Sequence, residues 1–259
     1  MDFSLALLES RHSVRSFAPT PLDRSIINML NSEATYTNSH EAGLNFRFCP
    51  DDNAPFRGFA RSYGMFRNVN NYLACIIDPT FDHALERAGF CAQRFVIRAH
   101  AAGLGTCFVG GTFSRAHVNT PVEVYEKIPF VVACGISDVE HTTLMARLSS
   151  RMAHRKVRAP RDFFDGNDAE YQAALSRFPW LDSALRAVAS APSALNAMPV
   201  SLKVTQVDGV ERIVAYTSNP DKYAAELGIA KFNVQAVVPG FWNWGENAPF
   251  FPINTFYRT

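Results

Sequence analysis

The sequence predicts an α+β protein in which mostly antiparallel sheets are flanked by helices and two similar halves share one chain. Two observations lead to this prediction. Segments with helical and strand-like patterns alternate along the 259 residues. In addition, "LDRSIINMLNSEATYTN" (22–38) resembles "LDSALRAVASAPSALN" (181–196), and "AAGLG" (101–105) resembles "AAELG" (224–228). Such a repeat implies two related α+β halves that pack against each other.

The apolar spacing places the elements of each half in a similar order. Helices are expected near 2–10, 21–33, 82–102, 180–191 and 220–236. Strands are expected near 44–49, 71–78, 129–137, 200–207, 211–218 and 251–258. The polar run "RDFFDGNDAEYQ" (161–172) is predicted to link the halves through a turn at Gly166–Asp168. Residues 1–160 and 161–259 would then form two halves of one globular unit.

Composition narrows the class of protein. The net charge of +1 gives no electrostatic case for nucleic acid, and no basic block suggests a membrane surface. No apolar run is long enough to span a bilayer. Five scattered cysteines form neither a disulfide framework nor a zinc motif, and no metal site is expected. We therefore expect a cytoplasmic protein.

A short arm near the start of the chain carries a candidate anion site. In "SRHSVRSF" (10–17), an extended backbone would place Arg11, Ser13 and Arg15 on one side, with His12 between them. Two guanidinium groups and a hydroxyl suit a phosphate, because the planar fork of arginine makes paired, charge-assisted hydrogen bonds. The alternative is a solvated arm with ordinary surface arginines.

A second basic run lies far along the chain, in "HRKVRAP" (154–160). Lys156 and Arg158 are again two residues apart, so both side chains could face the same way. Alone, this run is more typical of a solvated face. Together with the arm, it could complete an anion site drawn from two distant segments.

The segment "GLGTCFVGG" (103–111) follows a long helical pattern and contains four glycines. It matches neither a Walker loop nor a dinucleotide fingerprint. Gly103 could end the preceding helix. The pair Gly110–Gly111 would let the backbone approach a flat ligand closely and offer amide N–H groups to it.

The segment "APSALN" (191–196) ends a helical pattern that contains Leu181, Leu185 and Val188. Pro192 stops the helix, and Ser193 and Asn196 then present a hydroxyl and a carboxamide where the chain turns. Ordinary turn chemistry explains such residues equally well.

Taken together, these motifs resemble the FMN-dependent nitroreductase superfamily. "SRHSVRSF" is similar to its Arg-(Arg/His)-Ser-Val-Arg-x-Phe arm, and "GLGTCFVGG" to Gly-Leu-Gly-Thr-Cys-Trp-x-Gly-Gly, with Phe108 as the aromatic residue. "KVRAP" resembles a late Lys-x-Arg before proline. "APSALNAMP" resembles Ala-Pro-Ser-x-x-Asn-x-Gln-Pro, except that Met198 replaces the usual Gln and could not donate to a ring carbonyl.

The distribution of the motifs resembles one branch of this superfamily. The first half has lost the Pro-Ser in "EATYTNSHEAGLNF" (33–46), whereas the second half has an intact copy but no arginine-rich arm. This division is similar to the TM nitroreductase-like branch, in which one chain resembles a fused dimer. The resemblance implies a nitroreductase-like fold.

The resemblance also implies FMN as the cofactor, with no catalytic side chain assigned. The phosphate and ribityl chain would be held by Arg11, His12, Ser13, Arg15, Lys156 and Arg158. The ring would lie along Phe108, Val109, Gly110 and Gly111, and Pro192, Ser193, Ala194 and Asn196 would close the other side.

The implied activity is transfer of electrons from NAD(P)H through FMN to nitroaromatic, quinone or similar small-molecule acceptors, by a monomeric pseudo-dimer or a homodimer. Two alternatives stay open. One is a specialised flavin oxidase of the same superfamily. The other is a protein that binds FMN or another flat ligand without turnover.

Overall fold

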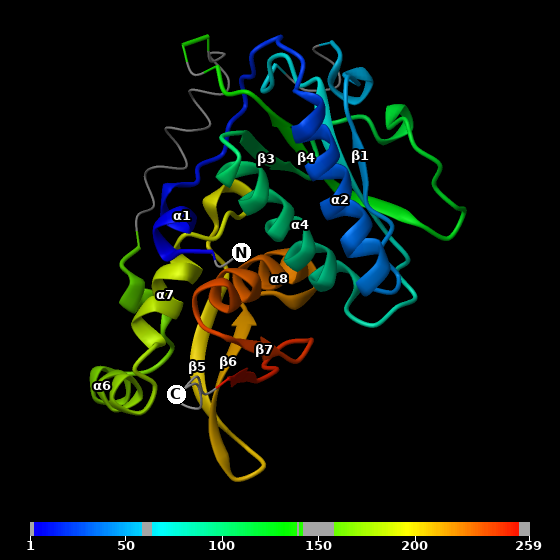
Figure 1. Cartoon of the computed structure of the whole chain (residues 1–259). Coiled ribbons are helices and arrows are strands. Elements are labelled where there is room, and N and C mark those ends of the chain that lie inside the picture. Colours follow the sequence, from blue (N-terminus) through cyan, green and yellow to red (C-terminus); the bar gives the residue numbers. More distant parts are fainter. Residues whose placement is uncertain (1–2, 59–63, 139, 142–157, 254–259) are drawn as a thin grey trace.

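The computed structural model describes residues 3–58, 64–138, 140–141 and 158–253. Helices and antiparallel sheets alternate along the chain, which confirms the predicted α+β class (Figure 1). None of the described helices is long and apolar enough to cross a membrane.

A four-stranded antiparallel sheet forms the centre of the first half. Its strands lie in the order β1 (Arg47–Cys49), β2 (Asn71–Ile77), β4 (Lys127–Gly135) and β3 (Gly105–Val109). Every residue of β2 is buried. Its side chains alternate between two clusters, with Leu73 and Cys75 in one and Tyr72 and Ala74 in the other. The sheet is therefore covered on both faces.

Helices cover one face of this sheet, and the arm and long loops cover the other. The helices are α1 (Leu5–Ser10), α2 (Arg24–His40) and α4 (Ala84–Ala101). Short 3₁₀ turns, η1 (Ala54–Phe56) and η2 (Arg115–His117), belong to the long loops. Residues of α2 and α4 share a core cluster with Leu73, whereas Val14 and Phe17 of the arm share the opposite cluster with Tyr72.

Helix α2 is longer than predicted. We expected it to end near residue 33, but it continues to His40 because no proline interrupts residues 33–40. In the second half, the similar segment forms α7 (Leu181–Ala189), which ends three residues before Pro192. The two similar segments thus differ in helix length, because only the second contains a proline.

No strand was predicted in the glycine-rich segment 103–111, but most of it is strand β3. This strand pairs with β4 from Gly105↔Gly135 to Val109↔Val131. A Cβ atom on Gly105 would lie 2.8 Å from Val14, so glycine here lets the arm approach the strand. Gly103 ends α4 as expected, with a φ of +81°.

The second half contains a two-stranded hairpin packed against helices. Its elements are η3 (Pro160–Phe163), α6 (Asp168–Arg177), α7, η4 (Ala194–Asn196), β5 (Val200–Val207), β6 (Val210–Thr217), α8 (Pro220–Val237), β7 (Gly240–Trp242) and β8 (Phe250–Pro252). β8 begins where a final strand was expected, and residues 254–258 of that prediction lie outside the described residues.

Helix α6 was missed by the sequence analysis, which assigned residues 161–172 to a link. The predicted turn instead caps a helix. Asn167 Oδ1 accepts a hydrogen bond from Glu170 N at 3.0 Å, and Glu170 Oε2 accepts one from Asn167 N at 2.7 Å. These reciprocal bonds form a capping box, which satisfies backbone donors at the start of the helix.

The two halves meet along the contact between α4 and α8, here called the seam. A methyl group on Gly89 would overlap the carbonyl oxygen of Ala225, and one on Gly228 would overlap that of Glu86. The two contacts are reciprocal. On each helix, a glycine faces a carbonyl of the other helix, and the residue three positions earlier supplies the carbonyl that the other glycine faces. Gly228 lies inside α8, which continues to Val237. The similarity between "AAELG" (224–228) and "AAGLG" (101–105) therefore does not mark a second helix end.

Two large clusters of the hydrophobic core draw mainly on different parts of the chain. One cluster contains mainly residues before 135, and another contains only residues from Phe163 onward. Phe90 of α4 packs against both clusters. The boundary near residue 160 stays a prediction. The relation of the two halves by a pseudo-twofold axis stays a prediction.

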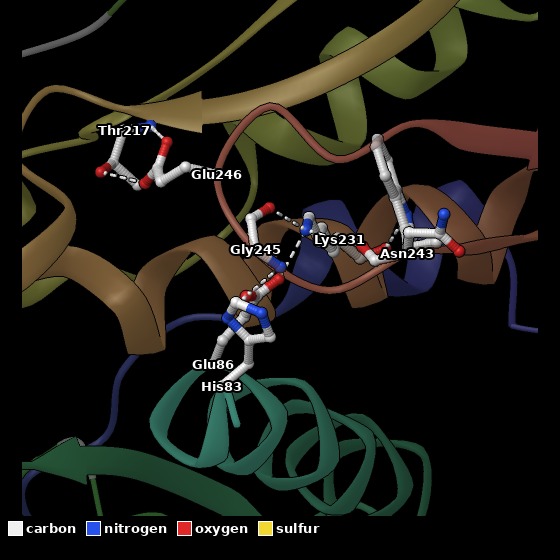
Figure 2. A network of polar contacts seen from close by, with 8 residues as sticks. His83, Glu86, Thr217, Lys231, Asn243, Gly245 and Glu246 are labelled. Atoms are coloured by element: carbon white, nitrogen blue, oxygen red, sulfur yellow. Dashed lines mark hydrogen bonds and ion pairs between the residues drawn. The ribbon is translucent and has the colours of Figure 1, made fainter. Parts of the chain in front are cut away.

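A buried ion pair reinforces the seam (Figure 2). The Lys231 ammonium, which is 0% exposed, lies 2.5 Å from Glu86 Oε1 and donates to the carbonyls of Asn243 at 3.0 Å and Gly245 at 2.8 Å. Glu86 Oε2 accepts a hydrogen bond from Gly245 N at 2.8 Å. Burial lowers the pKa of Lys231, and the charge of Glu86 opposes this shift. The network fastens the loop around Gly245 to both helices.

Close approach at the seam predicts the effect of Gly228→Ala. Glycine to alanine inside a helix normally stabilises by up to ~1 kcal/mol. Here the added methyl group would overlap a backbone carbonyl, so we expect the free energy of unfolding to fall by about 1–3 kcal/mol. Urea unfolding measures this change. Gly111→Ala is the matched control, because a Cβ at Gly111 meets open space. Unchanged or increased stability of Gly228→Ala would contradict the close packing.

Candidate functional site

The arm (residues 11–17) lies along the edge strand β3 in an extended conformation. Ser13 bridges Thr106 in parallel, and Val14 N donates to Thr106 O at 2.9 Å. Val14 is buried against the sheet, while Arg11, Ser13 and Arg15 all approach the thiol of Cys107. Burial raises the pKa of that thiol, and the charges of Arg15 and Arg11 and a hydrogen bond with Ser13 lower it. His12 is exposed, and the common side of Arg11, Ser13 and Arg15 stays a prediction.

The side chain of Arg11 is half-buried, and its guanidinium group is incompletely paired. Its Nε atom is buried without a hydrogen-bond acceptor among the described residues, and no described carboxylate forms an ion pair with Arg11 or Arg15. Burial lowers the pKa of Arg11. The pKa of nearby His100 is lowered by burial and then by the charges of Arg11 and His12.

A buried cationic donor without an acceptor costs about 1–3 kcal/mol or more. An anionic ligand with several acceptor oxygens would complete its hydrogen bonds. This part of the site therefore fits a phosphate.

Strand β3 leads from the arm to an open surface. Phe108 packs on Phe130, with ring centroids 5.6 Å apart, and Val109 is buried. The next two residues, Gly110 and Gly111, are exposed, and a Cβ atom on either would meet open space. Neither glycine has a positive φ, so no turn requires glycine there. No side chain covers the backbone at the two glycines. This open backbone fits the expected approach of a flat ligand.

The late basic run is only partly described. Lys156 lies outside the described residues. The Arg158 guanidinium donates to Met198 O at 3.0 Å and to Asp162 O, and it lies 4.3 Å from the centre of the Phe163 ring. These contacts tie Arg158 to the second half of the chain. Its role in an anion site shared with the arm stays a prediction.

The segment 191–198, here called the Pro-Ser loop, has an unusual backbone. Leu195, Asn196 and Met198 have φ values of 53°, 53° and 47°, in the left-handed region. Such conformations cost about 1–3 kcal/mol each for residues other than glycine, and asparagine tolerates them best. Leu195 is 91% exposed. The surrounding structure therefore holds this loop in a shape that the isolated chain would rarely adopt.

Three polar contacts hold the Pro-Ser loop. Ser193 Oγ accepts a hydrogen bond from Met198 N at 2.9 Å, Ala194 N donates to Glu226 Oε1 at 3.3 Å, and Arg158 binds Met198 O. The hydroxyl of Ser193 thus serves the turn, as the simpler interpretation of this segment predicted. The side chain of Met198 packs on the second core cluster.

Helix α1 brings the start of the arm close to the helix that precedes the Pro-Ser loop. Glu9, two residues before Arg11, forms a paired contact with Arg186 of α7, at 2.9 Å and 3.0 Å. Figure 1 shows α1 and α7 on the same side of the molecule. Segments from the two halves are thus tied together next to the expected site.

Sequence reasoning missed residues that support the site from a distance. Glu226 of α8 holds Ala194 N, and Thr106 pairs with the arm. No motif marked Glu226, because its contact depends on how α8 packs. Gly105 gave a usable signal, since a glycine inside a strand indicates close approach of another backbone.

Comparison with known proteins gives a family and a fold. The family model described as "Putative TM nitroreductase" matches residues 5–237. No curated protein sequence matches the chain. The crystal structure of a protein from Thermotoga maritima that is described as a nitroreductase is similar over 96% of this chain and 93% of its own, at 17% identity and a TM-score of 0.61.

Two further solved structures are similar over part of the chain. An FMN-dependent nitroreductase from Clostridium difficile covers 59% of this chain and 96% of its own, at 18% identity and a TM-score of 0.41. A nitroreductase with bound FMN from Bacteroides fragilis covers 54% and 90%, at 16% identity and a TM-score of 0.43. The Thermotoga structure confirms the nitroreductase-like fold, and the family model confirms the expected family. The chain belongs to the TM nitroreductase family.

Proposed function

We propose that this protein is an FMN-dependent oxidoreductase that passes electrons from NAD(P)H to nitroaromatic, quinone or similar acceptors. The observation that carries the proposal is the Nε atom of Arg11, which is buried and has no acceptor in the described residues. Arg11, Ser13 and Arg15 all interact with the thiol of Cys107, which lies on the strand that ends at Val109. Family membership and the nitroreductase-like fold support the same conclusion.

The residues present fit FMN better than a dinucleotide. The cationic cluster suits one terminal phosphate, and the chain contains no dinucleotide fingerprint. Arg11, Ser13 and Arg15 would hold the phosphate and ribityl chain. Phe108–Gly111 would lie along the ring, and Pro192–Asn196 would lie on its other side.

When bound, the flavin supplies the redox chemistry, and the protein supplies binding, orientation and electrostatics. Arg11 and Arg15 would neutralise the phosphate. The backbone at Gly110–Gly111 would leave room for a flat ring, and the Pro-Ser loop would limit access of water to it. We assign no side chain to proton transfer.

Arg11→Ala tests the anion site. We expect FMN affinity to fall by about 1.5–3 kcal/mol, the value of a charged hydrogen bond, which is roughly a 10- to 150-fold increase in Kd. The stability of the apo protein should not fall, because the variant removes a buried cation with an unsatisfied donor. Fluorescence titration of FMN and a thermal melt measure the two quantities.

The matched control is Arg24→Ala, which removes an exposed arginine at the start of α2 and should leave FMN affinity unchanged. Equal FMN affinity of Arg11→Ala and wild type would refute the assignment of the arm. Release of FAD instead of FMN from the purified protein would refute the choice of cofactor.

Asn196→Gly tests whether the Pro-Ser loop contacts the flavin. Glycine adopts the left-handed backbone freely, so this variant removes the carboxamide without strain. Alanine is less suitable here, because it would be strained. We expect the FMN Kd to rise roughly 3- to 10-fold, as for the loss of one neutral hydrogen bond, and NAD(P)H-driven reduction of a quinone to fall with it.

The stability of apo Asn196→Gly should change by less than about 1 kcal/mol. Ser193→Ala is the comparison variant. It removes the acceptor of Met198 N, so it should lower the stability of the loop as well as flavin affinity. If Asn196→Gly binds FMN as tightly as wild type, the loop is an ordinary turn and this part of the proposal fails.

A further inference from the structure

A buried pair of amides crosses the seam between the halves. Gln93 of α4 and Asn233 of α8 are both 0% exposed. Gln93 Nε2 donates to Asn233 Oδ1 at 2.9 Å. Phe90 of α4 and Phe232 of α8 also meet across the seam, with ring centroids 5.3 Å apart.

Asn233 continues this contact to the end of α7. Its Nδ2 donates to Ala187 O at 3.0 Å and lies 3.4 Å from Ser190 Oγ. Ser190 caps the end of α7, directly after Ala189 and two positions before Pro192. Asn233 therefore fixes the point from which the Pro-Ser loop leaves the helix.

Gln93 belongs to the helix that leads to the other side of the site. Helix α4 ends at Ala101 and continues through Gly103 into β3, which carries Phe108 and leads to Gly110. Helix α8 also supplies Glu226, which holds Ala194 N within the Pro-Ser loop at 3.3 Å. The amide pair thus joins the supports of two segments that lie on opposite sides of the proposed flavin.

The direction of the hydrogen bonds leaves one acceptor unsatisfied. The carbonyl oxygen of Ala187 can only accept, so Asn233 presents its nitrogen to it. The Oδ1 atom of Asn233 is then left to accept the hydrogen bond from Gln93 Nε2. Gln93 Oε1 is consequently buried without a partner among the described residues. A partly satisfied buried network is less favourable than apolar side chains of similar volume. Stability alone therefore gives no reason for amides at this place.

We propose that the hydrogen bond between Gln93 and Asn233 is a positioning contact that fixes the spacing between β3 and the Pro-Ser loop, and hence the two sides of the flavin site. The inference rests on the proposed function, because it requires FMN at that site. Gln93 and Asn233 act through the segments they hold.

The test compares wild type with Gln93→Met/Asn233→Leu, in which both amides are replaced by apolar side chains. Ala187 O keeps its hydrogen bond from Ser190 Oγ, at 2.8 Å. We expect an apo melting temperature equal to or above that of wild type, together with an FMN Kd at least tenfold weaker. The visible circular dichroism of bound FMN should also change, because that signal reports how the ring is held.

Two further variants separate positioning from general loosening of the seam. Ile229→Val removes one buried methylene group from α8 and keeps both amide side chains, so it should lower the melting temperature and leave the FMN Kd and the circular dichroism unchanged. Gln93→Met alone keeps the contact of Asn233 with α7. It should weaken FMN binding about threefold, and it provides the test if the double variant does not fold.

The outcomes are distinct. Wild-type protein that binds no added FMN refutes the proposed function itself. Wild-type protein that binds FMN, with the amide variants binding equally tightly and with unchanged circular dichroism, refutes the positioning role and leaves the proposed function standing. An Ile229→Val variant that weakens FMN as strongly as the amide variants would also refute it.

Discussion

The structure depends on the close contact between α4 and α8. Gly89 and Gly228 let the two helix backbones meet at a distance that a methyl group would prevent. Lys231 and Glu86 form a buried ion pair beside this contact and fasten the loop around Gly245 to it (Figure 2). Most buried apolar side chains of α4 belong to the core cluster of the first half, and most of those of α8 belong to the cluster of the second half. The contact between the two helices therefore sets how the halves pack.

The site combines rigid support with a strained loop. The arm is hydrogen-bonded to β3, within a sheet that is buried on both faces. The Pro-Ser loop instead contains three left-handed residues, each costing about 1–3 kcal/mol. Ser193, Glu226 and Arg158 hold it in that shape. Backbone strain that is maintained by several contacts is typical of ligand sites. We propose that the strained shape of the loop serves to bind the flavin.

Local patterns predicted much of the fold and part of the site. Apolar periodicity located most helices and strands, and the arm motif singled out Arg11, Ser13 and Arg15, which all interact with Cys107. Three errors had local causes. The strand β3 was missed because glycines interrupt its pattern, and α6 was missed because its residues are mostly polar. Helix α2 was predicted too short, because no proline ends it near residue 33. Gln93, Asn233 and Glu226 could not be predicted, because their contacts join residues far apart in the sequence.

A crystal structure of the protein reconstituted with FMN tests the central claim most directly. We predict that the phosphate accepts a hydrogen bond from Arg11 Nε, and that the ring lies between Gly110–Gly111 and the Pro-Ser loop. FMN bound elsewhere, or a structure in which Arg11 Nε keeps no acceptor while the flavin is present, would contradict the account.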